Sequence, residues 1–149
     1  MKTIFYPILI ALAIVACNTA DQKVAGPIMS DSEKDKAGRD TASYTTIQWL
    51  DSTSIKLGNV KKGEMVEVAF RFKNSGDKQL VITNVSAGCG CTVPEKPQQP
   101  YAPGDEGVIK AKFDSKNQHV GPHTKYVTVT ANSKPNPIHQ LNFMVEITE

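Results

Sequence analysis

The sequence predicts an all-β fold, a β-sandwich of about seven strands, for residues 44–149 of the 149-residue chain. Two observations point to this fold class. Apolar residues recur at every second position in several short runs, which is typical of half-buried strands. Residues that favour turns separate these runs, and no run beyond the N-terminal apolar segment has the periodicity of a helix.

The first part of the predicted domain holds three or four of the strands. One or two leading strands are expected at residues 47–49 and 55–57. The clearest strand covers residues 66–72, where four apolar side chains alternate with small or charged ones. Asn74-Ser75-Gly76-Asp77 then favours a turn. The next strand, over residues 80–85, has apolar residues in both phases, which predicts burial on both faces or a β-bulge near its end.

The second part begins with a loop and continues with three strands. Four prolines fall within residues 94–104, so this segment is expected to be a loop. Alternation returns over residues 108–113, 126–131 and 141–147. Short strands joined by polar turns over about 105 residues are typical of an Ig-like β-sandwich.

Cys17 stands at the end of a segment that is typical of secretory signals. Lys2 provides a positive start, residues 4–14 are almost wholly apolar, and Ile14-Val15-Ala16 precede the cysteine. The apolar run is shorter than the ~20 residues needed to span a bilayer. Ile-Val-Ala-Cys also resembles a bacterial lipobox, which implies that residues 1–16 are removed as a lipoprotein signal peptide and that Cys17 is lipidated.

The lipobox also carries an expectation about location. Asn18 stands where an aspartate retains many lipoproteins in the inner membrane, so the outer membrane is favoured, with the domain facing the periplasm or the cell surface. Two or three acyl chains would anchor the protein firmly, since each buried methylene contributes ~0.8 kcal/mol. The membrane is therefore an expected partner, through lipid on Cys17.

Residues 17–43 are expected to form the lipidated cysteine and a flexible tether. Nine of the 26 residues from 18 to 43 are charged and large apolar side chains are scarce, so little surface can be buried to offset the entropy of ordering them. As a flexible coil, such a segment would span roughly 30 Å. The domain that follows would then stand clear of the membrane.

The charge balance argues against a nucleic-acid partner. Removing residues 1–16, among which Lys2 is the one charged residue, leaves 16 basic and 15 acidic residues. The densest group of lysines (Lys56, Lys61 and Lys62) is interrupted by apolar and glycine residues. Nucleic-acid binding requires a clustered basic face, and this pattern is typical of a solvated surface instead.

Gly88-Cys89-Gly90-Cys91-Thr92 is the most unusual local motif, and three interpretations stay open. In a strand the two cysteines would share a face with their Cα atoms ~6.6 Å apart, near the upper limit for a disulfide. A bend at Gly90 would allow a strained, easily reduced disulfide suited to redox exchange. Two small buried cysteines at a tight strand end are the second interpretation. The third is a copper or zinc site, for which His119 and His123 are the available extra ligands.

The other polar residues form no catalytic signature. His119, His123 and His139 lie in or beside polar loops, where exposure is the default. The carboxylates fall at turns and strand ends and make no convincing acid–base pair. The sequence contains no Gly-x-Ser-x-Gly elbow, no phosphate-binding glycine loop and no Cys-x-x-Cys motif. It therefore predicts a protein that is not an enzyme and that needs no cofactor.

Several of these segments together resemble a bacterial family known as domain of unknown function 1573. The resemblance runs from about Ile47 to Ile147. The segments that carry it are Leu57-Gly58-Asn59-Val60, Lys62-Gly63-Glu64, Phe70-Arg71-Phe72-Lys73-Asn74, Gly76, Leu80 to Thr92, Pro103-Gly104, Gly107, Gly121 and Thr130-Ala131-Asn132. One departure is Ala87, where a serine often precedes the glycine or cysteine. The resemblance implies an exported, often lipid-anchored protein with an Ig-like domain of the Hydin and major-sperm-protein kind, and it implies no established activity.

These observations lead to one functional hypothesis and one alternative. The hypothesis is a non-enzymatic, lipid-anchored Ig-like binding or scaffold module of the bacterial cell envelope. It would contact a protein or a glycan, for example by adding a strand at a sheet edge. The alternative is a thiol site at Cys89 and Cys91 for copper binding or disulfide exchange.

Overall fold

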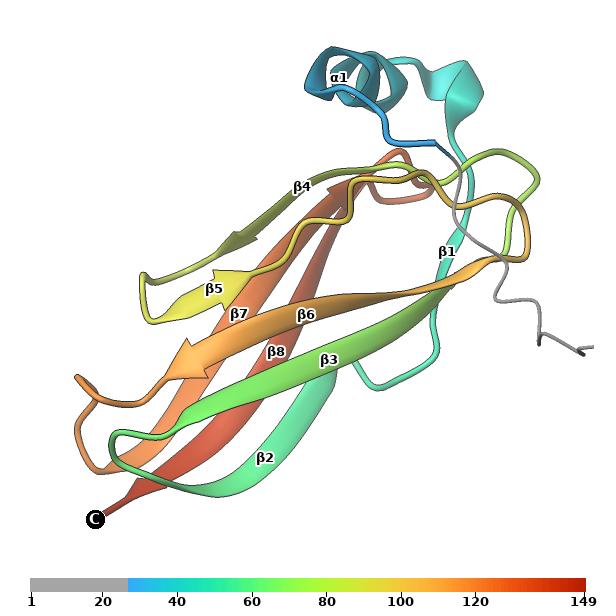
Figure 1. Ribbon diagram of the computed structural model, residues 1–149. Coiled ribbons are helices and arrows are strands. Elements are labelled where there is room, and N and C mark those ends of the chain that lie inside the picture. The colour runs from blue at the N-terminus through green and yellow to red at the C-terminus, as the bar shows by residue number, and fades with distance from the viewer. Residues whose placement is uncertain (1–26) are drawn as a thin grey trace, which may run out of the picture.

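The computed structural model describes residues 27–149, and these form a sandwich of two four-stranded β-sheets (Figure 1). The signal peptide, Cys17 and the first part of the predicted tether lie outside the described residues. One sheet has the strand order β1-β3-β6-β5 and the other β2-β8-β7-β4. The strands are β1 (Ile47–Trp49), β2 (Ser54–Lys61), β3 (Met65–Asn74), β4 (Ile82–Ala87), β5 (Thr92–Pro94), β6 (Glu106–Asp114), β7 (Gly121–Ala131) and β8 (Ile138–Thr148). The predicted all-β Ig-like sandwich is confirmed.

The core lies between the two sheets and follows the predicted alternation. In β3, Val68, Phe70 and Phe72 are buried while the residues between them are exposed or half-buried. From opposite sheets, Phe113 of β6 and Phe143 of β8 meet edge to face with ring centroids 5.7 Å apart. Edge-to-face contact suits aromatic rings because the positive edge of one meets the negative face of the other. The two sheets are thus joined by apolar side chains that the alternation had already assigned to the inner faces.

The leading segment of the domain contributes to both sheets. β1 pairs antiparallel with β3, and the chain then crosses to the other sheet, where β2 pairs parallel with β8. Arg71 fixes the crossing, because its guanidinium bonds the Asp51 carboxylate at 2.7 Å and its backbone N–H bonds the same carboxylate at 2.9 Å. One or two leading strands were expected, but the split between sheets could not be deduced from alternation alone.

The mixed-phase strand and the proline-rich loop also agree with expectation. Leu80, Val81 and Ile82 are all buried, which is the burial on both faces that the mixed phase predicted. The register between β4 and β7 shifts between Ile82 and Asn84, at the start of β4 and not near its end. Leu80 lies outside β4 and bridges to Tyr101. The short strand β5 was not expected, and it includes Pro94, the first residue of the loop predicted over residues 94–104.

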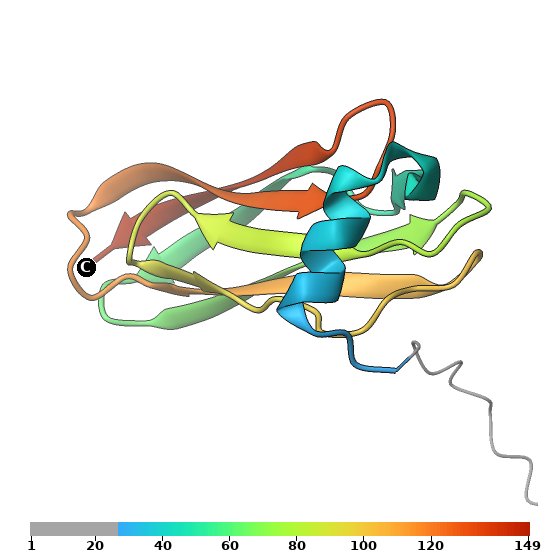
Figure 2. The same cartoon turned by 90° about the horizontal axis from the view of Figure 1, so that it is seen from above.

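A helix within the predicted tether is the main difference from expectation. α1 (Asp31–Arg39) is followed by a short 3-10 helix (Thr41–Ser43), and Figure 2 shows α1 lying across β4. Ser30 and Glu33 form a reciprocal capping box, a local signal that average composition does not register. Flexibility was therefore the wrong expectation for residues 31–39. No helix within residues 27–149 is long and apolar enough to cross a membrane.

α1 is held to the sandwich by a buried lysine and a close backbone approach. Lys34 is 2% exposed, and its Nζ donates to Oε1 of Gln98 at 2.6 Å. Burial, together with the neighbouring charge of Lys96, lowers the pKa of Lys34. Gly38 faces Thr83 of β4, whose Cγ2 would lie 3.0 Å from a Cβ at position 38. The mostly charged helix α1 thus contacts the sandwich through Lys34 and Gly38.

Candidate functional site

The Gly88-Cys89-Gly90-Cys91 loop carries the chain from β4 in one sheet to β5 in the other (Figure 1). Cys89 and Cys91 form a disulfide with an S–S distance of 2.02 Å. Their Cα atoms are 5.3 Å apart, closer than the ~6.6 Å expected of an extended strand. The difference arises because these residues lie in a turn. Of the interpretations drawn from the sequence, the structure shows the bent, disulfide-bonded form.

Gly88 lies directly against the side chain of Tyr126 in the neighbouring strand β7. Its N–H donates to the carbonyl of Tyr126 in β7 at 3.4 Å, and a Cβ at this position would overlap the Tyr126 ring. Any larger residue would push the aromatic ring or the loop away. The glycine therefore lets the disulfide loop start directly against β7.

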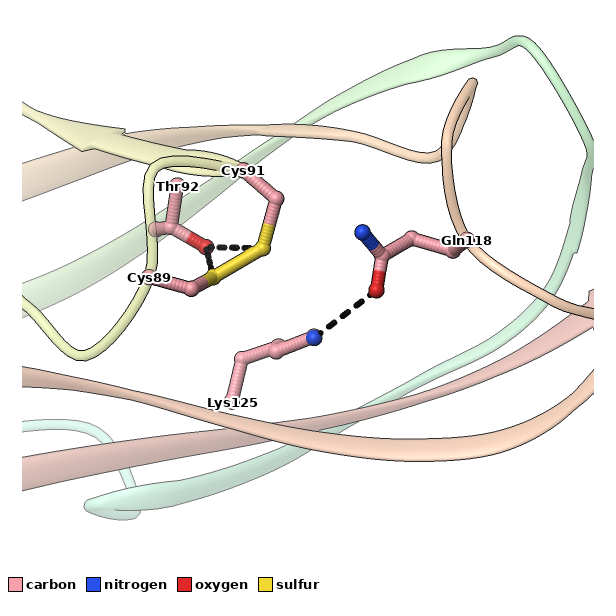
Figure 3. Close-up of a disulfide and its surroundings, with 5 residues drawn as sticks. All are labelled: Cys89, Cys91, Thr92, Gln118 and Lys125. Carbon is pink, nitrogen blue, oxygen red and sulfur yellow. Dashed lines mark hydrogen bonds between the residues drawn. A yellow bond between two sulfur atoms is a disulfide. The ribbon is translucent and has the colours of Figure 1, made fainter.

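Thr92 places a hydroxyl group against both sulfur atoms (Figure 3). Its Oγ1 lies 3.8 Å from Sγ of Cys89 and 3.9 Å from Sγ of Cys91, within the range of a weak hydrogen bond to sulfur. The side chain is 3% exposed, and its backbone N–H donates to the Cys89 carbonyl at 3.2 Å. A buried hydroxyl is thus fixed beside the disulfide by the turn itself.

An open cavity of about 450 Å³ lies against the disulfide. Its lining consists of Cys89, Gly90, Cys91, Asp114, Asn117, Gln118 and Lys125. Nζ of Lys125 donates to Oε1 of Gln118 at 2.9 Å, and Figure 3 shows this pair beside the sulfur atoms. A second cavity of about 160 Å³, on the side of Gly88 and Tyr126, is also lined by Cys89 and Lys125. Cys89 and Lys125 therefore line both spaces.

The two histidines that the metal interpretation required are engaged elsewhere. His123 is 9% exposed, and its Nε2 lies 2.8 Å from the carbonyl of His119. The two imidazole rings are 4.4 Å apart. Within residues 27–149, no three His, Cys, Asp or Glu side chains come together as a metal-binding group. The structure does not bring these imidazoles to Cys89 and Cys91 as a ligand set.

His139 was expected in an exposed loop, but it is half-buried in β8. Its ring packs edge to face on Trp49, with centroids 5.7 Å apart, and hydrogen-bonds Trp49 and Ser133. Burial lowers the pKa of His139. The tertiary contact joins residues 90 positions apart in sequence, so no local pattern could have indicated it.

The two packed sheets define an Ig-like sandwich domain. Its leading strands β1 and β2 lie in different sheets, and a disulfide lies in the loop that crosses from β4 to β5. The chain belongs to the family described as "Protein of unknown function (DUF1573)", whose model matches residues 48–147. The match extends over two thirds of the chain, and it confirms the family that the sequence motifs indicated. No curated protein matches the sequence.

Solved structures are similar to this chain in fold. A protein of unknown function from Porphyromonas gingivalis W83 has a TM-score of 0.62 and 16% identity over 71% of this chain and 48% of its own. A human domain, the ASH/PapD-like domain 7 of CEP192, has a TM-score of 0.52 and 12% identity over 72% of this chain and 87% of its own. The secreted serine protease VesC from Vibrio cholerae has a TM-score of 0.53 and 9% identity, over 69% of this chain but 23% of its own. At these identities, the likeness shows the fold alone.

Proposed function

We propose that the protein is a lipid-anchored, non-enzymatic binding module of the bacterial cell envelope, and that it binds an extended peptide segment at the edge of β4. The lipid anchor rests on the lipobox-like sequence before Cys17, which favours the outer membrane. The binding mode rests on one structural observation. Among the edge strands of the two sheets, β4 presents backbone groups that no other described part of the chain covers.

The outer side of β2 is blocked at both ends by its own neighbours. Ser52 Oγ accepts from the Ser54 N–H at 3.2 Å and donates to the Ser54 carbonyl at 2.8 Å. At the other end, the Lys61 N–H donates to Oε2 of Glu64 at 3.1 Å, and the Lys61 carbonyl accepts from the Glu64 N–H at 3.0 Å. Side chains and turns that occupy an edge in this way prevent pairing with another strand.

The edges of β5 and β1 are similarly restricted. The Thr92 N–H is bonded to Cys89, and Pro94 has no N–H to offer. β1 is only three residues long, and the chain on either side of it bonds the opposite sheet. Those bonds run from the Thr45 N–H to the Asn132 carbonyl at 2.9 Å and from the Asn142 N–H to the Thr53 carbonyl at 2.7 Å.

β4 differs because its outward backbone groups have no such cover. Gly88 donates to Tyr126 on β7, and hydrogen-bonded residues alternate along an antiparallel pair. The N–H and C=O groups of Val85 and Ala87 therefore point away from β7. α1 approaches the strand near its start, where Gly38 faces Thr83. A partner strand can add four backbone hydrogen bonds there, each contributing about 1 kcal/mol.

A proline substitution at the β4 edge tests this proposal. Ala87→Pro removes an outward N–H while leaving the ladder with β7 in place, so the fold should be retained. Lys56→Pro is the matched control, because it removes an outward N–H from the middle of the β2 edge, whose two ends are blocked. Proteins crosslinked to the full-length chain in the native envelope should be lost with Ala87→Pro and kept with Lys56→Pro. Hydrogen exchange of the isolated complex should show the amides of Val85 and Ala87 protected by the partner.

Two results would contradict the proposal. Equal capture by wild type and both proline variants would place binding away from the β4 edge. Catalytic turnover of a substrate by the purified chain, abolished by a point substitution, would show that the protein is an enzyme.

A further inference from the structure

The Cys89–Cys91 disulfide does little to hold the fold together. A disulfide stabilises by restricting the unfolded chain, and this effect increases with the number of residues between the cysteines. Here one residue separates them, and the bond joins two points of the same loop. The two sheets are already joined by the β4–β5 connection and by the apolar core. A structural purpose therefore does not explain why two cysteines are placed in this turn.

The two sulfur atoms occupy different surroundings. Cys89 is partly exposed and lines both the larger cavity and the smaller one. Cys91 borders only the larger cavity, and it packs against the apolar core. Of the two, Cys89 lines both cavities, so we expect an incoming thiolate to attack its sulfur.

Two polar groups are positioned to stabilise a thiolate in this loop. The buried hydroxyl of Thr92 contacts both sulfur atoms, and Lys125 lines both cavities, with its ammonium group bonded to Gln118 of the larger one. A hydrogen-bond donor and a positive charge lower the pKa of a thiol, and a thiol of lower pKa leaves faster in exchange. Asp114 is the opposing charge in the cavity, and its Oδ1 accepts from the Lys116 N–H at 2.8 Å.

We propose that Cys89 and Cys91 are a reversible thiol–disulfide exchange site for a dithiol reductant, with Thr92 and Lys125 as positioning residues. This property is additional to binding at the β4 edge and does not depend on it. A thiolate of the dithiol attacks Sγ of Cys89, the S–S bond breaks, and Cys91 leaves as a thiolate. The second thiolate of the reductant then attacks its partner sulfur and releases Cys89. The reductant becomes a disulfide, and its two electrons and two protons pass to the cysteine pair.

Reduction of the purified full-length protein with dithiothreitol, under conditions that keep it folded, tests the proposal. Alkylation at intervals, followed by mass spectrometry of the peptide that holds both cysteines, gives the rate without interference from Cys17. Thr92→Val should slow reduction about tenfold, because the hydroxyl donor is lost, and Thr92→Ser should restore it. Lys125→Gln should slow reduction about three- to fivefold, because one positive charge is lost. Lys78→Gln, at an exposed lysine outside both cavities, is the matched control and should leave the rate unchanged.

The site of attack gives a second readout. Glutathione, a monothiol, should be trapped as a mixed disulfide on Cys89 rather than on Cys91, and fragmentation of the labelled peptide locates it. A disulfide that resists dithiothreitol until the chain unfolds would overturn the proposal. If Thr92→Ser, Lys125→Gln and a folded Thr92→Val are all reduced at the wild-type rate, Thr92 and Lys125 do not have the proposed roles. If Thr92→Val does not fold, the Lys125→Gln and Lys78→Gln comparison decides the assignment of Lys125.

Discussion

The indole N–H of Trp49 donates a hydrogen bond to Nδ1 of His139 at 3.3 Å, and this bond links β1 in one sheet to β8 in the other. Ser133 Oγ donates to the Asn136 carbonyl at 2.7 Å. Because this hydroxyl proton is used, the Ser133 oxygen must accept a hydrogen bond from Nε2 of His139, which is 2.8 Å away. The two contacts together require a neutral His139 with its proton on Nε2.

Protonation of His139 is expected to weaken the fold at low pH. Burial, against a smaller opposing effect of a backbone hydrogen bond with Asn136, lowers the pKa of His139 below its ordinary 6.5. Below pH 6.5 the unfolded chain binds a proton that the folded chain does not. The free energy of unfolding should fall as pH decreases from 6.5 toward the lowered pKa, by at most ~1.4 kcal/mol per pH unit from this group.

Urea unfolding at about pH 7.5 and about pH 5, for wild type and His139→Gln, measures this effect. The difference in stability between the two proteins should become smaller at the lower pH. His119→Gln, at an exposed histidine, is the control and should follow wild type. Parallel loss of stability in all three proteins would show that His139 is not responsible.

The contact between Phe113 and Phe143 predicts a large stability loss on truncation. Both side chains are fully buried, so Phe113→Ala should lower the free energy of unfolding by about 3–5 kcal/mol through lost burial and the cavity left behind. Val93→Ala, at an exposed apolar residue of β5, should change it by less than about 0.5 kcal/mol. Chemical denaturation of both variants checks the prediction. Similar values for the two would contradict the assignment of the core.

The docking of α1 on β4 depends on Gly38. Since even a Cβ would lie 3.0 Å from Cγ2 of Thr83, the branched side chain of Gly38→Val should push the helix off the strand. Ser32→Val, at an exposed position of the same helix, carries a β-branched side chain without the clash and is the control. Limited proteolysis should cut within residues 31–39 faster in Gly38→Val than in Ser32→Val. Equal cleavage rates would show that Gly38 does not hold the helix in place.

Cys17 is predicted to attach the protein to the membrane. Cys17→Ser should abolish incorporation of a labelled palmitate analogue and move the protein from the membrane fraction to the soluble fraction, because the acyl chains supply the membrane affinity. Cys89→Ser is the matched control and should remain labelled and membrane-bound. Labelling of Cys17→Ser at the wild-type level would contradict the lipid-anchor proposal.

Alternation predicted most of the sandwich, because a strand that is buried on one face has apolar residues at every second position. The inner residues of β3, β6, β7 and β8 could be assigned in this way before any pairing was known. The parallel pairing of β2 with β8 could not, because alternation is the same for either strand direction. α1 was missed because composition averaged over residues 18–43 conceals the local capping signal at Ser30 and Glu33.

The site was only partly predictable for a related reason. The motif indicated that Cys89 and Cys91 lie close together, because only one residue separates them in the sequence. It could not indicate Thr92 as their contact, or Gln118 and Lys125 as neighbours. The side chain of Thr92 depends on how the turn closes, and the other two residues come from a loop and a strand distant in sequence.

The sequence by itself determined the features that repeat or act locally: the β class, the turns, the lipobox-like segment before Cys17 and the proximity of Cys89 to Cys91. Only the tertiary structure decided which strand edges stay uncovered, where α1 docks, and what surrounds the sulfur atoms. The physical reason is the range of the interactions. Alternation and turn preference arise between near neighbours in the chain, whereas an edge, a cavity or the Trp49–His139 bond exists only when distant segments pack together.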